Sequence, residues 1–286
     1  MGHGEPSSGD PSKGNTGVSR SDPSETGQDP KRRFQSTVAY YDRYRLDYPQ
    51  RLLARVRDLV GLRCGDPVLD LGTGTGMLAT GFAKLGMAVT AMDPEPDMLA
   101  AAAARAGATG VAVDLVAGGW ADLRPGMGPY RLVTMGRSFH WMDRTATLAM
   151  LDKIVAPGGG VALFHDAHPP VEENAWFKTL CAVQDKFGRR AAPHIGERRG
   201  GHRRYEPFLF ASAFTQLDGL SVTIRQPLTV DDIVGRAFSM SVCSREALGA
   251  RAEQFAAALN QALRELSPDG TFTEVAELVG LLARRP

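Results

Sequence analysis

The chain has 286 residues, of which 43% are hydrophobic, and its formal net charge at pH 7 is +1. This length and composition suit one large globular domain, and the balanced charge gives no electrostatic case for a nucleic-acid or membrane-surface protein. Three widely separated cysteines argue against a disulfide framework and fit a reducing compartment. No apolar run is long enough to span a membrane and the N-terminus lacks the apolar core of a signal peptide, so we expect a soluble cytoplasmic protein.

The first thirty residues differ in composition from the rest of the chain. Residues 1–30 are small, polar or proline, with almost no large apolar side chain. Such a segment buries too little apolar surface to offset its ordering entropy, so we expect a disordered tail. Order should begin near Phe34, where aromatic and apolar residues fall at helical spacing, and two short helices should precede the first strand. The folded domain is therefore placed at residues 31–286.

From residue 67 onward, short apolar runs alternate with segments of helical periodicity, which predicts a doubly wound α/β sheet with parallel strands. After residue 166 this alternation ends, and Pro227 favours an edge position for the strand that contains it. The predicted strands are 68–71, 88–93, 111–116, 130–135, 161–164, 221–229 and 276–283. The predicted helices are 77–85, 97–105, 143–155, 176–187, 231–240 and 244–266, with a half-helical segment at 208–214.

A glycine-rich turn separates the first predicted strand from the helix that follows it, in the sequence Asp70-Leu-Gly-Thr-Gly-Thr-Gly76. Strand, glycine turn and helix together bring backbone amides and a helix N-terminus against a small polar ligand. The acid directly before the glycines indicates that part of this ligand is cationic. A dinucleotide fold uses the spacing G-x-G-x-x-G, which Gly74-x-Gly76-x-x-Ala79 with Asp93 downstream imitates, so a NAD-binding protein stays open as an alternative.

This turn resembles the first motif of the class I S-adenosylmethionine-dependent methyltransferases. Further matches follow in the order of that family: Asp93-Pro94 closes the second strand, and Pro157-Gly-Gly-Gly160 precedes the fifth. The chain is most similar to the small-molecule subgroup of type 11 and trans-aconitate methyltransferase-like proteins. That subgroup shares Tyr41-Asp-Arg-Tyr-Arg45 before the first strand and Phe139-His-Trp141 after the fourth.

The resemblance implies a fold and a domain organisation. It implies a Rossmann-like sheet of seven strands in the order 3-2-1-4-5-7-6, with the last strand antiparallel. It also implies a helical cap over the acceptor, made of segments 31–60, 167–215 and 231–266.

The resemblance further implies S-adenosylmethionine as the cofactor, with S-adenosylhomocysteine as its product. Asp93 would accept both ribose hydroxyls, Asp70 would take the ammonium group, and Arg45 would bind the methionine carboxylate with its fork of donors. Around adenine, many relatives carry an acid where this chain has Gly119-Trp120-Ala121, which leaves Asp122 as the remaining acidic candidate. The complete predicted cofactor set is Tyr41, Arg45, Asp70, Gly72, Thr73, Gly74, Asp93, Pro94, Met98, Trp120, Ala121 and Arg137.

Methyl transfer is a displacement at carbon, which needs alignment and exclusion of water, and a base only when the acceptor carries a proton. His140, after the fourth strand, and His165, after the fifth, are the predicted bases, since histidine titrates near neutral pH. A purely structural role for His140 stays open. His165 and His168 beside Asp166 are too sparse a set to predict a metal site.

We expect the acceptor to be a small organic molecule, either an aromatic or polyketide-like compound of secondary metabolism or a carboxylic acid. The basic loop 186–204 keeps an RNA methyltransferase open as an alternative, although a solvated lid explains this loop more simply. A non-catalytic relative of the family is the third alternative. The sequence leaves both a monomer and a homodimer open, and it does not identify the methylated atom.

Overall fold

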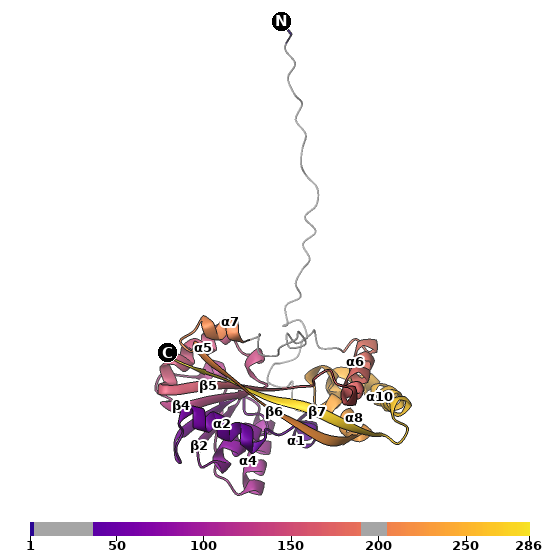
Figure 1. The fold of residues 1–286 in the computed structure, drawn as a ribbon, viewed down its shortest axis with the longest axis horizontal. Coiled ribbons are helices and arrows are strands. Elements are labelled where there is room, and N and C mark those ends of the chain that lie inside the picture. The colour runs from indigo at the N-terminus through magenta and orange to yellow at the C-terminus, as the bar shows by residue number, and fades with distance from the viewer. Residues whose placement is uncertain (3–36, 190–204) are drawn as a thin grey trace.

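The structure is a computed structural model that describes residues 1–2, 37–189 and 205–286 (Figure 1). The predicted disordered tail, the predicted start of order near Phe34 and most of the basic loop 186–204 lie outside the described residues. None of the helices in the described ranges is long and apolar enough to cross a membrane.

One sheet of seven strands forms the centre of the fold, in the order β3-β2-β1-β4-β5-β7-β6. Strands β1 to β5 run parallel, and β7 is antiparallel to both of its neighbours. This confirms the predicted order, the antiparallel last strand and the edge position of the strand that contains Pro227. The strands are β1 (Pro67–Leu71), β2 (Ala88–Asp93), β3 (Asp114–Ala117), β4 (Tyr130–Gly136), β5 (Val155–Ala167), β6 (Gln216–Thr229) and β7 (Thr271–Arg284).

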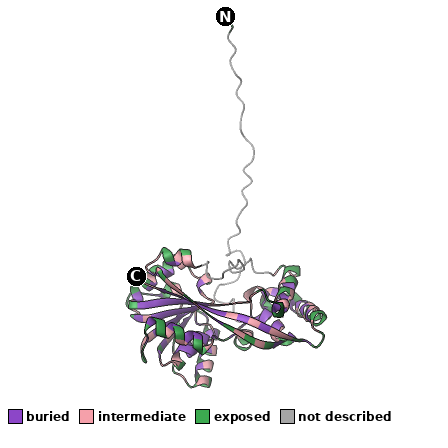
Figure 2. Ribbon diagram, viewed as in Figure 1, coloured by how far each residue is buried: buried purple, intermediate pink, exposed green. Residues whose placement is uncertain are grey.

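Helices cover both faces of this sheet, and Figure 2 shows that its central strands are mostly buried, whereas the edge strands β3 and β6 are largely exposed or half-buried. On one face, α2 packs its apolar stripe of Leu52, Leu53 and Val56 against the sheet, together with α3. On the other face, α5 and α7 pack against β4 and β5. Helix α4 lies beside α3 and contacts β2 and β3. These helices are α2 (Gln50–Val60), α3 (Met77–Lys84), α4 (Pro96–Thr109), α5 (Arg144–Ile154) and α7 (Glu206–Phe210).

A two-stranded ribbon extends beyond the sheet and carries helices of the predicted cap segments; we keep the name cap for this ribbon and its helices (Figure 1). Strand β5 pairs with β7 only as far as Glu277, whereas the pairing of β6 with β7 continues to Thr229 opposite Thr271. On the ribbon, α6 (Ala175–Lys186), α8 (Val230–Phe238) and α10 (Ala252–Leu266) enclose a third apolar core.

Helix α1 (Val38–Tyr44) joins the cap to the parallel part of the sheet. It lies against α8, where Gly235 lets the helices approach closely. A Cβ built on Gly235 would lie 2.4 Å from the ring of Tyr44. The residue after α1 is therefore brought close to the C-terminal end of α8.

Several sequence-based predictions about element bounds were wrong. Strand β3 begins at Asp114 rather than at 111, β5 at Val155 rather than at 161, and β6 and β7 at Gln216 and Thr271 rather than at 221 and 276. The predicted helix 244–266 is divided into α9 (Arg245–Leu248) and α10, because Gly249 adopts φ +55° between them. The predicted helix 97–105 continues to Thr109 and ends at the left-handed Gly110. Strand β5 continues to Ala167 because β7 pairs with it that far, so His165 lies inside the strand rather than after it.

Candidate active site

The glycine turn between β1 and α3 is held against the end of β2. The amides of Gly72 and Thr73 donate to the carbonyl oxygen of Met92 at 2.8 and 3.1 Å. The φ angles of Gly72 and Gly74 are +70° and +55°, in the region that favours glycine. A Cβ built on Gly72 would lie 2.7 Å from the Cβ of Ser138, whereas one built on Gly74 would meet only a methionine sulfur at 4.0 Å. A side chain at position 72 would therefore collide with the loop after β4, so the fold itself requires glycine there.

Asp70, at the end of β1, is a buried carboxylate whose side-chain partners are neutral hydroxyls. The Thr73 hydroxyl donates to its Oδ2 at 2.6 Å and the Thr134 hydroxyl to its Oδ1 at 2.8 Å. Thr134 is the residue of β4 directly opposite Asp70 in the register. Asp70 is 1% exposed and forms no ion pair within the part of the chain that the structure describes. Burial raises the pKa of Asp70 to about 6.

Asp93, at the end of β2, holds the turn through both of its oxygens. The Gly74 amide donates to Oδ2 at 2.8 Å, and the Glu95 amide donates to Oδ1 at 3.0 Å. Burial raises the pKa of Asp93, although these two amides act in the opposite direction. Each carboxylate oxygen has a second lone pair, so the two backbone contacts leave room for the predicted ribose hydroxyls.

Arg45 lies directly after α1 and reaches the cap. Its Nε donates to the hydroxyl of Ser239 at 2.8 Å, and its guanidinium carbon lies 5.3 Å from the ring centre of Tyr41. Burial lowers the pKa of Arg45. Among the described residues, no carboxylate forms an ion pair with this guanidinium. Within these residues, Arg45 is therefore a partly buried cation without a carboxylate in direct contact.

Arg137, at the end of β4, has by contrast a carboxylate partner and further contacts. Its φ of +56° makes it the one non-glycine residue with a positive φ in the described ranges. Its side chain pairs with Asp166, donates to the carbonyl oxygen of Leu46 at 2.9 Å and lies 4.8 Å from the ring centre of Tyr48. Burial alone would lower the pKa of Arg137, but the charge of Asp166 raises it well above its usual value. Arg137 ties the segment after α1 to β4 and β5.

A small pocket opens between the glycine turn and the segment around α1. It brings together five residues of the predicted cofactor set, which come from α1, β1, the turn and the end of β4. Sequence reasoning missed Tyr48 and Gly136, which also line it. The lining residues are Tyr41, Tyr48, Asp70, Gly72, Thr73, Met77, Leu78, Gly136 and Arg137.

The residues predicted to surround adenine lie along the neighbouring strand ends rather than in this pocket. Met98 of α4 is 4% exposed, and its sulfur would lie 4.0 Å from a Cβ built on Gly74. Trp120 begins a single 3-10 turn, Trp120–Asp122, and packs partly buried against the core under α5. Pro94 and Ala121 are exposed. Asp122, the remaining acidic candidate, accepts from the Gly119 amide at 2.9 Å and so caps this turn.

The candidate bases lie on different elements. His140 is half-buried in the turn Phe139–Trp141, where its ring centre lies 4.8 Å from that of Trp141. His165 is half-buried inside β5. Its neighbour Phe164 packs on Tyr48, so strand alternation directs His165 to the opposite face of the sheet. Asp166 and His165 therefore point to opposite faces.

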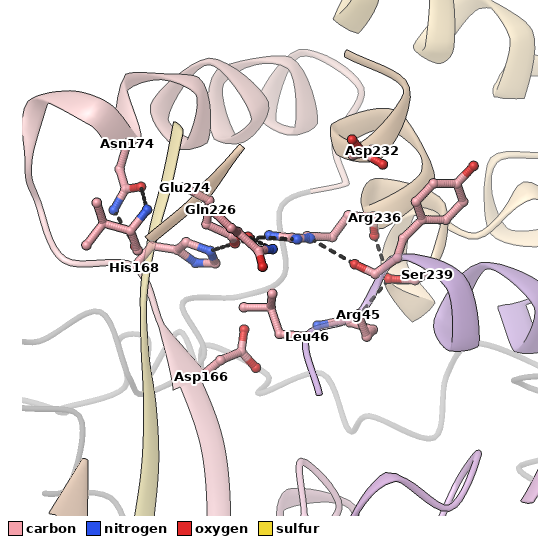
Figure 3. Close-up of polar contacts among 12 residues, drawn as sticks. Arg45, Leu46, Asp166, His168, Asn174, Gln226, Asp232, Arg236, Ser239 and Glu274 are labelled. Atoms are coloured by element: carbon pink, nitrogen blue, oxygen red, sulfur yellow. Dashed lines mark hydrogen bonds and ion pairs between the residues drawn. The ribbon is translucent and has the colours of Figure 1, made fainter. Parts of the chain in front are cut away.

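His168 belongs to a buried polar cluster that sequence reasoning missed (Figure 3). Its Nε2 lies 2.7 Å from Oε1 of Glu274, a carboxylate with no exposed surface. Arg236 binds both oxygens of Glu274, and Gln226 donates to Oε2 at 2.9 Å. Burial alone would raise the pKa of Glu274, but the contacts with His168 and Arg236 lower it overall. No motif marked this cluster, because Glu274 lies outside the predicted strand 276–283 and its partners come from distant segments of the chain.

The chain is similar to known methyltransferases. Residues 68–159 match the protein family described as a methyltransferase domain. Uncharacterized methyltransferases of Mycobacterium bovis and Mycobacterium tuberculosis are each 30% identical to the chain over 156 residues. The match covers 54% of this chain and 60% of each relative, so the chain spans less than two thirds of the length of these relatives.

Two solved structures share the fold. A protein of Anaeromyxobacter dehalogenans described as a type II methyltransferase has a TM-score of 0.57 and 20% identity, covering 85% of this chain and 98% of its own. The phosphoethanolamine N-methyltransferase 2 of Haemonchus contortus has a TM-score of 0.50 and 14% identity, covering 89% of this chain and 58% of its own. At these identities the likeness concerns the fold alone.

Proposed function

We propose that the chain is a class I S-adenosylmethionine-dependent methyltransferase that transfers the methyl group of S-adenosylmethionine to a small organic acceptor, which the match of residues 68–159 to a methyltransferase domain supports. The relatives that support the family are themselves uncharacterized, so the reaction and its acceptor are inferred from the residues of the candidate site.

The observation that carries the proposal is a buried carboxylate, Asp70, and a partly buried guanidinium, Arg45, neither of which forms an ion pair among the described residues. Asp70 lies among hydroxyl groups and Arg45 binds a serine, and Tyr41 links them because it lines the pocket beside Asp70 and stacks with Arg45. Burying unpaired charges destabilises a fold unless a ligand compensates them. An amino-acid group, with an ammonium and a carboxylate, supplies both missing partners. S-adenosylmethionine carries such a group at its methionine end.

The remaining predicted contacts extend from this pocket along the strand ends. Asp93 would bind the ribose hydroxyls while its backbone contacts fix the glycine turn. Met98 and Trp120 would pack on adenine, and Pro94 and Ala121 would border it. Gly74, with open space beside it, would let the turn approach the ligand.

When bound, the cofactor supplies an activated methyl group on a sulfonium ion. The protein's part is to hold the acceptor in line with that methyl group and to exclude water. His140, beside the pocket-lining end of β4, is the candidate to take a proton from an acceptor that carries one, and His165 is the second candidate. Arg137, paired with Asp166, would act by positioning the segment after α1 over the cofactor.

The acceptor would bind under the cap, which we assign to segments 31–60, 167–215 and 231–266. The balanced net charge of the chain and the apolar composition of these segments favour a small organic acceptor, which we take to be an aromatic compound or a carboxylic acid. An RNA acceptor stays the second candidate because of the basic loop 186–204.

The test is a measurement of S-adenosylhomocysteine formation by the full chain. The chain is incubated with S-adenosylmethionine and separate panels of phenols, aromatic polyketides, carboxylic acids and RNA. The proposal expects turnover with a small-molecule panel. Turnover with RNA alone, falling steeply as salt is raised, would support the alternative acceptor.

A further inference from the structure

Tyr48, which lies in the segment between α1 and α2, has a buried hydroxyl group that nothing described so far uses. The residue is 6% exposed. Among the residues that the structure describes, its hydroxyl has no hydrogen-bond partner. Buried polar groups are nearly always hydrogen-bonded, and leaving one unpaired destabilises the fold. The group is therefore available to a water molecule or to a ligand in the pocket.

The ring of Tyr48 is fixed by its neighbours on two sides. It meets the ring of Phe164 edge-on, with centroids 5.4 Å apart and an interplanar angle of 61°. The Arg137 guanidinium lies on it, 4.8 Å from its centre. A Cβ built on Gly136 would lie 3.3 Å from the Tyr48 hydroxyl oxygen. Since Gly136 and Tyr48 both line the pocket that contains Asp70, the hydroxyl is held at the wall of that pocket.

The chemistry of the group defines what it would bind. Burial raises the pKa of Tyr48, so the phenol stays protonated at neutral pH and can donate a hydrogen bond. The hydrogen of this hydroxyl needs a partner with a lone pair, while its oxygen can in addition accept a hydrogen bond. At the amino-acid end of the cofactor, the ammonium has only donors and the sulfonium is cationic, so the carboxylate is the one good acceptor.

We propose that the Tyr48 hydroxyl donates a hydrogen bond to the carboxylate of the cofactor's amino-acid end, which it shares with Arg45. This assignment rests on the proposed function, because it takes S-adenosylmethionine as the ligand of the pocket. It makes Tyr48 a cofactor-specificity residue: it recognises the amino-acid group and contributes nothing to binding of the nucleoside.

The test compares two ligands on one conservative variant, Tyr48→Phe, which keeps the ring and removes only the hydroxyl. S-adenosylhomocysteine contains the amino-acid group, whereas 5′-methylthioadenosine shares its adenine, ribose and sulfur but lacks that group. Calorimetric titration of the full chain should show that the variant binds S-adenosylhomocysteine roughly ten-fold or more weakly, since the lost hydrogen bond is to a charged group. Its affinity for 5′-methylthioadenosine should be unchanged.

The melting temperature of the ligand-free variant gives an independent readout. Because the hydroxyl is unpaired without ligand, its removal should leave the melting temperature unchanged or raise it, whereas a structural hydroxyl would lower it on removal. Tyr130→Phe is the matched control: Tyr130 is 7% exposed and begins β4, at the end of the strand away from the pocket, so neither ligand's affinity should change.

Two results would overturn the assignment while leaving the proposed function intact. One is an S-adenosylhomocysteine affinity of Tyr48→Phe within two-fold of the wild type. The other is an equal loss for both ligands. Failure of the wild-type chain to bind S-adenosylhomocysteine at all would instead overturn the proposed function, and this assignment with it.

Discussion

The Nε atom of Arg45 donates a 2.8 Å hydrogen bond to the hydroxyl of Ser239, a residue 194 positions away at the end of α8. The same hydroxyl donates to the carbonyl oxygen of Arg236 at 2.6 Å, so its position is set by the cap helix. The cation proposed to bind the cofactor's carboxylate is thus oriented from the cap. Cofactor binding should depend on a part of the chain outside the matched residues 68–159.

Removing the Ser239 hydroxyl should weaken cofactor binding. In Ser239→Ala, Arg45 loses the contact that orients it, and we expect the Kd for S-adenosylhomocysteine to rise by roughly three- to ten-fold, the range of one ordinary hydrogen bond. Ser244→Ala is the control, because Ser244 is also a buried cap serine but only caps α9. If calorimetry gave Ser239→Ala and Ser244→Ala the same affinity for S-adenosylhomocysteine, a positioning role for Ser239 would be contradicted.

Replacing Asp70 should affect stability and binding in opposite directions. Its pKa in the folded protein, about 6, is above its unfolded value of about 4. The stabilisation that the protonated group gives is therefore present at low pH and is lost as the pH rises from about 4 to about 6. For the wild type, this loss in the free energy of unfolding is at most about 3 kcal/mol, because the pKa differs by about two units. The loss should be absent from denaturation curves of ligand-free Asp70→Asn.

The same variant should bind the cofactor poorly, because the ammonium loses its carboxylate. We expect at least a ten-fold weaker affinity for S-adenosylhomocysteine at pH 7.5. For the wild type, affinity should fall as the pH is lowered through about 6. A pH-independent wild-type affinity between pH 5 and 8 would argue that Asp70 does not contact the ammonium.

Asp93→Ala should abolish most binding of both S-adenosylhomocysteine and 5′-methylthioadenosine. The two ligands share the ribose that Asp93 is proposed to bind, and the substitution also releases the amides of Gly74 and Glu95. Asp93→Asn keeps an acceptor for one amide and should lose less affinity. Calorimetry with both ligands distinguishes the role of Asp93 from that of Tyr48, because Tyr48→Phe should weaken binding of S-adenosylhomocysteine alone. An unchanged affinity of Asp93→Ala would refute the site assignment.

The buried cluster in the cap should matter for stability. Glu274→Gln leaves the guanidinium of Arg236 buried without a full counter-charge, and we expect a loss of about 3–5 kcal/mol in the free energy of unfolding. Because the pKa of Glu274 is lowered in the fold, its contribution is present above the unfolded pKa and is lost as the pH falls. Urea denaturation at pH 7 and at pH 4 measures both effects.

The control for this prediction is Glu253→Gln, which breaks the exposed pair with Arg245. Surface pairs of this kind contribute about 1 kcal/mol or less. If the two substitutions lowered the free energy of unfolding equally, the cluster around Glu274 would stabilise the fold no more than an exposed ion pair does.

The parallel half of the fold was predictable because local pattern and topology agree there. The apolar run before Gly72 and the acid at position 93 each mark a strand end by residue type alone. The glycines at 158–160, which the sequence placed before the fifth strand, lie inside β5 instead. The cap was less predictable, since its helices pack on a ribbon whose length depends on pairing between β6 and β7. Gly249 inside an apolar helical pattern was the signal that the helix at 244–266 would break.

At the candidate site, the residues that the sequence predicted belong to local motifs, whereas the residues that it missed are brought there by tertiary contacts. Asp70 and Asp93 stand next to recognisable motifs. Tyr48, Thr134 and Ser239 reach the site only through tertiary contacts: Thr134 through the strand register and Ser239 through the packing of α8 on α1. No spacing in the sequence predicts such contacts, because they join segments that are far apart in the chain.

The central claim is that the pocket beside Asp70 holds the amino-acid end of S-adenosylmethionine. Its most direct test is a calorimetric titration of the full wild-type chain with S-adenosylhomocysteine, 5′-methylthioadenosine and NAD. The account predicts one S-adenosylhomocysteine bound per chain, more tightly than 5′-methylthioadenosine, and no binding of NAD. Binding of NAD in place of S-adenosylhomocysteine, or equal affinity for the ligands with and without the amino-acid group, would contradict it.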